Sequence, residues 1–285
     1  MSQTNRLLGY PDDARLLILN ADDFGMYQAI NTAIQRTLKE GVVCSASLMV
    51  PWPGAPDAMT WLAQNPDVSF SVHLSIICDI DTYRQRPLTP ADKVPSLVDE
   101  SGYFYTLDHM DELLARASPD ELETEFRAQI ETVFDTGLRP THVDWHCLHN
   151  GGRAAIFDLT LRLAKEYGLA LRVSGQPYTE QVQRQGLPSP DYELLDSFGV
   201  DITRKSAIYT QMLRDLPPGL TEWAVHPGLG DAESQAIDPG GWQVRQTDFD
   251  FLMSPEASDR IRQEGIILLD YKPLQKLWQS KSQPA

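Results

Sequence analysis

Two neighbouring carboxylates, Asp22 and Asp23, follow the apolar residues 16–19 and precede a segment with helical patterning. Adjacent carboxylates repel one another and burial raises that cost, so such a pair commonly holds a cation or shares a proton. In parallel α/β folds the carboxyl end of a strand is also where ligands bind. The alternative is that one Asp caps the next helix while the other is solvated.

Histidines also fall at alternating positions in two later segments. His142, Asp144 and His146 alternate with apolar residues, so an extended strand would send all three to one face. His73 lies in a second alternating segment, residues 68–74, on the same face as small serines. A lone strand histidine is more often a hydrogen-bonded core residue. One carboxylate with two imidazoles from separate strands, however, suits a catalytic divalent ion with open coordination positions.

A further histidine, His226, ends the strand-like residues 221–226, and Pro227 and Gly228 fix the exit of the chain. An imidazole titrates near neutral pH. Across a pocket from a cation, His226 could therefore donate a proton to a leaving group. The alternative is a histidine that stabilises the turn before the proline.

Together, and in this order, these motifs resemble those of the YdjC-like (ChbG/HpnK) carbohydrate deacetylases. The resemblance rests on residues 20–25, on the histidine segments and on the His-Pro-Gly at 226–228, and it spans residues 15–271. It implies a distorted (β/α) barrel and one divalent ion, with magnesium or zinc as the first candidates. By the same resemblance, the metal ligands would be Asp23, His73 and His142, the general base Asp22 and the general acid His226.

The resemblance also implies residues near the pocket that bind substrate or support the residues that do. These are Asp144, His146, Arg172 and Arg245. The chain departs from many members of the family at residues 147–150, where His149 falls out of phase with His146. The roles of these two histidines, and the identity of the sugar, stay open at this point.

Strand-like and helix-like segments alternate along the chain, which indicates a parallel sheet. We expect an α/β fold, a distorted TIM-like (β/α) barrel with a mostly parallel sheet, in a single domain of residues 1–285. Residues 118–121 predict a capping box at the start of a helix. Two loop insertions, at about 78–110 and 175–199, should lie over the site, and residues 280–285 should form a flexible tail.

Composition limits the classes of partner. The 40 acidic and 24 basic side chains give a net charge of −16, which disfavours nucleic acid and anionic membranes and favours a small carbohydrate. A homodimer stays open. Three cysteines are too few for a disulfide framework, and no apolar run resembles a secretory signal or a membrane span, so we expect a cytoplasmic protein.

The resemblance implies hydrolysis of an N-acetyl group on an amino sugar or a short chitooligosaccharide. One alternative is a metal-dependent phosphoesterase, for which Arg172 and Arg245 could clamp the phosphate. Another is a non-catalytic carbohydrate-binding or regulatory barrel. Residues 23–25 also spell the metal-binding tripeptide of protein kinases, but the other kinase motifs are missing.

Overall fold

The computed structural model describes residues 2–282, in which ten strands alternate with helices. The strands are β1 (Arg15–Phe24), β2 (Ser45–Leu48), β3 (Ser69–Leu74), β4 (Ile77–Cys78), β5 (Tyr105–Thr106), β6 (His142–Trp145), β7 (Ala170–Leu171), β8 (Leu195–Asp196), β9 (Gly219–Val225) and β10 (Ile267–Leu268). The helices are α1 (Gln3–Leu8), α2 (Gln28–Glu40), α3 (Ala55–Gln64), α4 (Met110–Arg116), α5 (Pro119–Asp135), α6 (Ala154–Tyr167), α7 (Tyr178–Gln183), α8 (Lys205–Asp215), α9 (Ala232–Ile237), α10 (Trp242–Leu252), α11 (Pro255–Gln263) and α12 (Lys272–Ser282).

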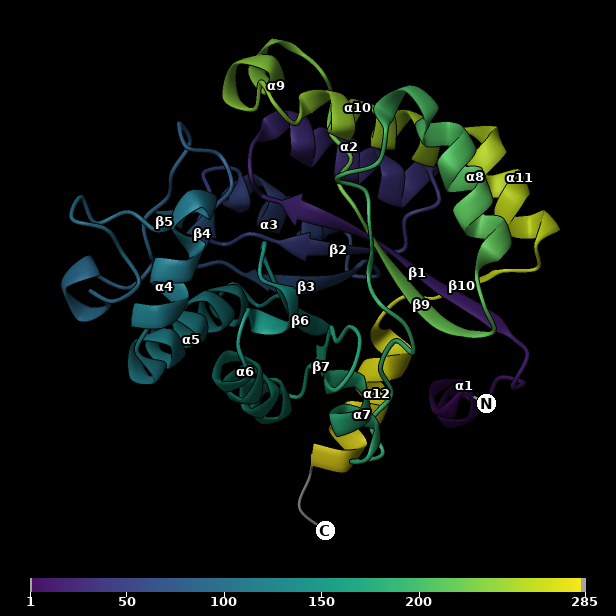
Figure 1. Cartoon of the computed structure of the whole chain (residues 1–285), viewed down its shortest axis with the longest axis horizontal. Coiled ribbons are helices and arrows are strands. Elements are labelled where there is room, and N and C mark those ends of the chain that lie inside the picture. The colour runs from purple at the N-terminus through teal and green to yellow at the C-terminus, as the bar shows by residue number, and fades with distance from the viewer. Residues whose placement is uncertain (1, 283–285) are drawn as a thin grey trace.

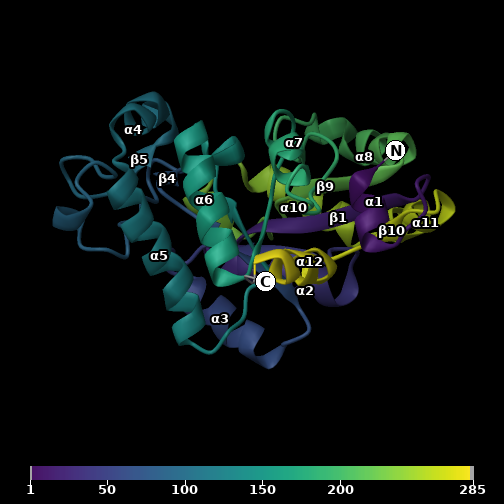
Figure 2. The same ribbon diagram turned by 90° about the horizontal axis from the view of Figure 1, so that it is seen from below.

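One eight-stranded sheet organises the molecule. Its order is β7-β6-β3-β2-β1-β9-β8, with β10 paired to β1 as well, and its pairings within residues 2–282 are parallel. The sheet curls with helices around it, and the arrow of β1 points to the side where β4, β5 and α4 lie (Figure 1). From below, α5, α6 and α12 cover one face (Figure 2). The predicted α/β class and TIM-like parallel sheet are confirmed, as a half-barrel whose edge strands β7 and β8 are not paired with each other in the described residues.

The inner face of the curled sheet carries small polar side chains at positions where an ordinary hydrophobic core would carry large apolar ones. Ser45 and Ser47 on β2, and Ser69 and Ser71 on β3, are all buried. Because strand residues alternate between faces, these serines share the inner face with His73. They leave room for the larger charged and aromatic groups that converge there.

The start of α5 differs from its prediction. The helix begins at Pro119 after Ser118, as the capping box implied, but the Ser118 side chain makes no cap hydrogen bond. Glu121 Oε2 instead accepts a hydrogen bond from the backbone N of Ser96 at 2.7 Å, and Ser118 N donates to Ser96 Oγ at 2.8 Å. A contact with the 78–110 segment has therefore replaced the local box.

The predicted flexible tail also needs correction. Residues 280–282 form the last turn of α12, and residues 283–285 lie outside the described part of the chain. Among residues 2–282, the helices are all too short or too polar to cross a lipid bilayer.

Candidate functional site

A cavity of about 570 Å³ opens at the carboxyl ends of the strands, a volume within the ~300–1,000 Å³ range of small-molecule sites. Sequence-predicted residues that line it are Asp22, Asp23, His73, His146, Arg172 and His226. Both loop insertions also contribute, with Asp79, Ile80 and Leu107 from the first and Leu194, Asp196 and Phe198 from the second. The cavity is therefore built from the sheet edge and is bordered by the two insertions.

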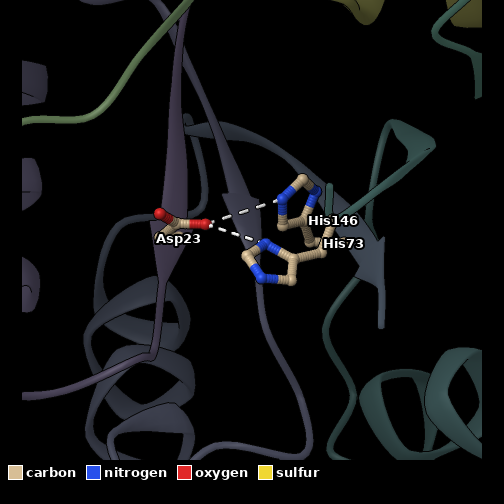
Figure 3. A group of neighbouring side chains, drawn as sticks. All are labelled: Asp23, His73 and His146. Carbon is tan, nitrogen blue, oxygen red and sulfur yellow. Dashed lines mark ion pairs between the residues drawn. The ribbon is translucent and has the colours of Figure 1, made fainter. Parts of the chain in front are cut away.

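Three buried side chains inside this cavity point toward one another: Asp23 from β1, His73 from β3 and His146 just after β6 (Figure 3). Asp23 Oδ1 lies 3.3 Å from His146 Nδ1 and 3.7 Å from His73 Nε2. One ligand atom from each residue lies within 4.8 Å of the other two. Of the expected ligands, the structure thus brings Asp23 and His73 together, and it adds His146.

His142, the third expected ligand, is not part of this group, and that expectation is corrected. In the pairing of β3 with β6, His73 lies beside Asp144, while His142 lies beside Ser71, one inward-facing position deeper. Two strand residues span about 6.5 Å, so His142 lies about that much farther from the cavity than His73 does. Its ring stacks on Tyr271 with centroids 3.5 Å apart, and burial lowers its pKa to about 3.

Each imidazole of the group is held from behind by a carboxylate. His73 Nδ1 lies 2.8 Å from Asp144 Oδ1, and His146 Nε2 lies 3.2 Å from Asp79 Oδ1. With a cation bound, a proton on each of these outer nitrogens would leave the inner nitrogen, which faces Asp23, with its lone pair for the ion. This is the arrangement that orients imidazoles as metal ligands.

Asp22 is held as a carboxylate by Arg172. The two guanidinium nitrogens Nη1 and Nη2 donate to Asp22 Oδ2 and Oδ1 at 2.7 and 2.8 Å. Burial alone would raise the pKa of Asp22, but the adjacent Arg172 charge and its hydrogen bonds outweigh burial and lower it. Arg172 also donates to Glu222 Oε1 at 2.8 Å and lies 3.2 Å from Asp144 Oδ2.

Arg245 binds one carboxylate oxygen of Asp23 and leaves the other facing the imidazoles. Arg245 Nη1 donates to Asp23 Oδ2 at 2.8 Å, and its Nε donates to Asp238 Oδ2 at 3.1 Å. Burial would raise the pKa of Asp23, yet Arg245 and His146 hold it well below the usual value. Oδ2 is therefore occupied by the arginine, while Oδ1 faces the two imidazoles.

His226 lies on the β9 side of the cavity with a different kind of partner. Its Nδ1 lies 2.7 Å from the hydroxyl of Ser197, and the ring of Phe198 packs edge-on with centroids 4.7 Å apart. The backbone N of His226 donates to the buried Asp248 Oδ2 at 2.8 Å. The imidazole is thus oriented by Ser197 and Phe198, which follow β8, while Asp248 of α10 holds the backbone of the same residue.

Sequence reasoning did not single out Asp79, Ser197, Asp238 and Asp248. All four lie in loops or helices without alternation, so no periodic signal marks them. The alternation did place His146 on the same face as His142. That pattern was the one signal in the sequence that could have put His146 beside Asp23 and His73.

Comparison with known proteins places the chain in a family. Residues 16–263 match the model of the YdjC-like protein family, and the chain belongs to that family. A relative from Geobacillus stearothermophilus named carbohydrate deacetylase is 31% identical over 264 residues, covering 92% of this chain and 99% of the relative. Another relative of the same name, from Thermoanaerobacter pseudethanolicus, is 29% identical, and the alignment covers 91% of this chain and 99% of the relative.

A solved structure shares the fold along nearly the whole chain. The crystal structure of a putative cellobiose-phosphate cleavage protein from Enterococcus faecalis aligns with a TM-score of 0.76 and 28% identity. The alignment covers 91% of this chain and 98% of that one.

Proposed function

We propose that the protein is a metal-dependent carbohydrate deacetylase that hydrolyses the N-acetyl group of an amino sugar or a short chitooligosaccharide. Membership of the YdjC-like family and the names of the curated relatives support this. The observation that carries the proposal is the convergence of Asp23, His73 and His146 in a cavity that Asp22 and His226 also line.

The donor set fits one divalent ion. Tetrahedral zinc with ordinary bond lengths separates a nitrogen and an oxygen ligand by about 3.3 Å. Asp23 Oδ1 lies 3.3 and 3.7 Å from the two imidazole nitrogens, so a cation would need only small shifts. We therefore assign the ligands as Asp23, His73 and His146. The mixed nitrogen and oxygen set favours zinc, and magnesium is the second candidate.

The chain supplies the proton transfers of an amide hydrolysis. The cation would supply Lewis acidity to the acetamide carbonyl and to the attacking water. Asp22, kept ionised by Arg172, takes the proton of that water. An amine leaves poorly unless it is protonated, so His226 donates a proton to the sugar nitrogen. With His226 Nδ1–H donating a hydrogen bond to the hydroxyl of Ser197, Nε2 would carry the proton that is transferred.

The same contacts favour amide hydrolysis over phosphoester hydrolysis. Arg172 and Arg245, the expected phosphate clamp, are both bonded to carboxylates of the site. The cavity lining also includes five carboxylates, at positions 22, 23, 79, 196 and 238. An uncharged acetylated sugar avoids repulsion by this lining, whereas a phosphate group does not.

Acetate release from N-acetylated chitooligosaccharides tests the proposal. The apo-enzyme prepared with a chelator should be inactive, and zinc or magnesium should restore acetate release, because the cation supplies the Lewis acid. Phosphate release from phosphorylated sugars is the matched control. Phosphate release without acetate release, or full activity after verified metal removal, would contradict the proposal.

A further inference from the structure

A second group of metal-ligating atoms lies on the outer side of His146. We propose that Asp79, His146 Nε2 and Cys147 form a second cation site, at the mouth of the cavity, for a thiophilic ion such as zinc or cadmium. One ligand atom from each of the three residues lies within 4.8 Å of the others. The second site needs only these side chains, so its existence does not depend on the proposed activity. The two sites share the imidazole of His146.

The distances match those expected between ligands of one cation. His146 Nε2 lies 3.2 Å from Asp79 Oδ1 and 3.3 Å from Cys147 Sγ. Ordinary zinc bond lengths at tetrahedral angles give about 3.3 Å between nitrogen and oxygen and about 3.6 Å between nitrogen and sulfur. A cation would therefore fit after movements of a few tenths of an ångström.

The backbone at Cys147 adds an independent observation. This residue has φ of 56°, in the left-handed region, where residues other than glycine, asparagine and aspartate are uncommon and strained. The preceding residue is anchored, because His146 N donates to Leu74 O at 3.0 Å. In this conformation the thiol is held against the imidazole, so the strained residue is also the one that supplies the sulfur ligand.

The site is open to ions and leaves a coordination position free. Asp79 and Cys147 both line the cavity, and Cys147 is exposed. Arg245 Nη2 lies 3.8 Å from Asp79 Oδ2, on the oxygen that does not face His146. Water from the cavity can complete the shell, and the acidic lining raises the local concentration of cations.

Occupation of the second site has a defined proton balance. The S–H bond of Cys147 and the N–H bond at His146 Nε2 break, bonds from sulfur and nitrogen to the cation form, and two protons pass to solvent. No electron transfer is involved. Asp79 then no longer accepts the Nε2 proton that orients His146, so excess zinc should inhibit the enzyme through this site.

Cadmium binding followed by ultraviolet absorption tests the proposal without relying on activity. The full-length protein, saturated with magnesium, is titrated with cadmium, and a thiolate-to-cadmium band should appear and saturate near one equivalent. Cys147→Ser should abolish the band, whereas Cys78→Ala, which removes a buried cysteine of β4, should keep it. Absence of the band in the wild type, or its persistence in Cys147→Ser, would overturn the site.

Asp79→Asn gives a second readout. The thiolate band should remain at saturating cadmium, but the apparent affinity should fall by about tenfold or more, because an anionic ligand is lost. An unchanged affinity would remove Asp79 from the site. A band without acetate release would leave this site standing and refute only the deacetylase. Acetate release without a band would refute the second site and leave the deacetylase proposal standing.

Discussion

The two sides of the cavity treat their histidines differently. On the β3 and β6 side, His73 and His146 each have a carboxylate behind the ring, Asp144 and Asp79. On the β9 side, the hydrogen-bond partner of His226 is the neutral hydroxyl of Ser197, and the carboxylate of Asp196 lies farther off, at 3.9 Å from the same nitrogen. A carboxylate strengthens an imidazole as a ligand and fixes its orientation, whereas a hydroxyl orients the ring without a charge. One side is thus suited to hold a cation and the other to move a proton.

The division is also visible in the two adjacent aspartates. Asp22 has both oxygens bonded to Arg172, and Asp23 keeps Oδ1 directed at the imidazoles while Arg245 takes Oδ2. Each arginine therefore relieves the repulsion between neighbouring carboxylates in a different way. In the proposed mechanism, one aspartate is the base and the other is a ligand.

The largest expected effect comes from removing the proton acceptor. Asp22→Asn should lower the turnover number by about 10²–10⁴-fold, because general-base catalysis contributes roughly that much. The bound cation should remain, as measured by elemental analysis. Loss of the cation in this variant would instead make Asp22 a ligand and erase the contrast between the two aspartates.

The next effect separates the two candidate histidines, His142 on β6 and His146 just after it. His146→Ala should weaken cation affinity by more than about 100-fold, since it removes a ligand and its oriented lone pair. His142→Phe keeps a ring against Tyr271 and should leave cation affinity unchanged. Equilibrium dialysis with zinc measures both. The opposite ranking would restore His142 as the ligand.

A smaller effect is expected on the proton-donating side. Ser197→Ala should lower the turnover number by about tenfold, with little change in cation affinity, because Ser197 orients His226 and touches no proposed ligand. In the double variant with His226→Ala the two losses should not multiply, since Ser197 acts through His226. Fully multiplicative losses in steady-state kinetics would show that Ser197 acts elsewhere.

The last prediction concerns stability and pH rather than catalysis. Folding lowers the pKa of His142 from its ordinary 6.5 to about 3, so the unfolded chain binds more protons between those values. Stability should therefore fall as pH drops from 6.5 toward 3, by about 1.4 kcal/mol per pH unit from this residue alone. His142→Phe should flatten that slope in urea unfolding, whereas His109→Gln, at an exposed site, should not. Equal slopes in the wild type and His142→Phe would refute the buried neutral imidazole.

Sequence patterns could predict which face of the sheet a functional strand residue occupies, but not how far along the strand it lies from the cavity. Alternation placed His142, Asp144 and His146 together, and these residues do project to one face. Which of them meets Asp23 depends on the register between β3 and β6, and that register is set by contacts between distant segments. The same limit applies to Ser118, whose predicted local cap is replaced by a bond to Ser96.

Residues in the insertions were beyond sequence reasoning for a related reason. Asp79 and Ser197 follow no period, and their partners His146 and His226 are distant along the chain. By contrast, the pairing of Asp22 and Asp23 at a strand end pointed to a cation or a shared proton, because burying two charges has a cost, and the histidine segments decided between that reading and a helix cap. The signal was strong where electrostatics demanded a partner and weak where loops supplied one.

Anomalous diffraction from crystals grown with zinc or manganese tests the central claim most directly. The account predicts a peak within about 2.0–2.3 Å of Asp23 Oδ1, His73 Nε2 and His146 Nδ1. A peak coordinated by His142, or no peak within reach of Asp23 at saturating ion, would contradict it.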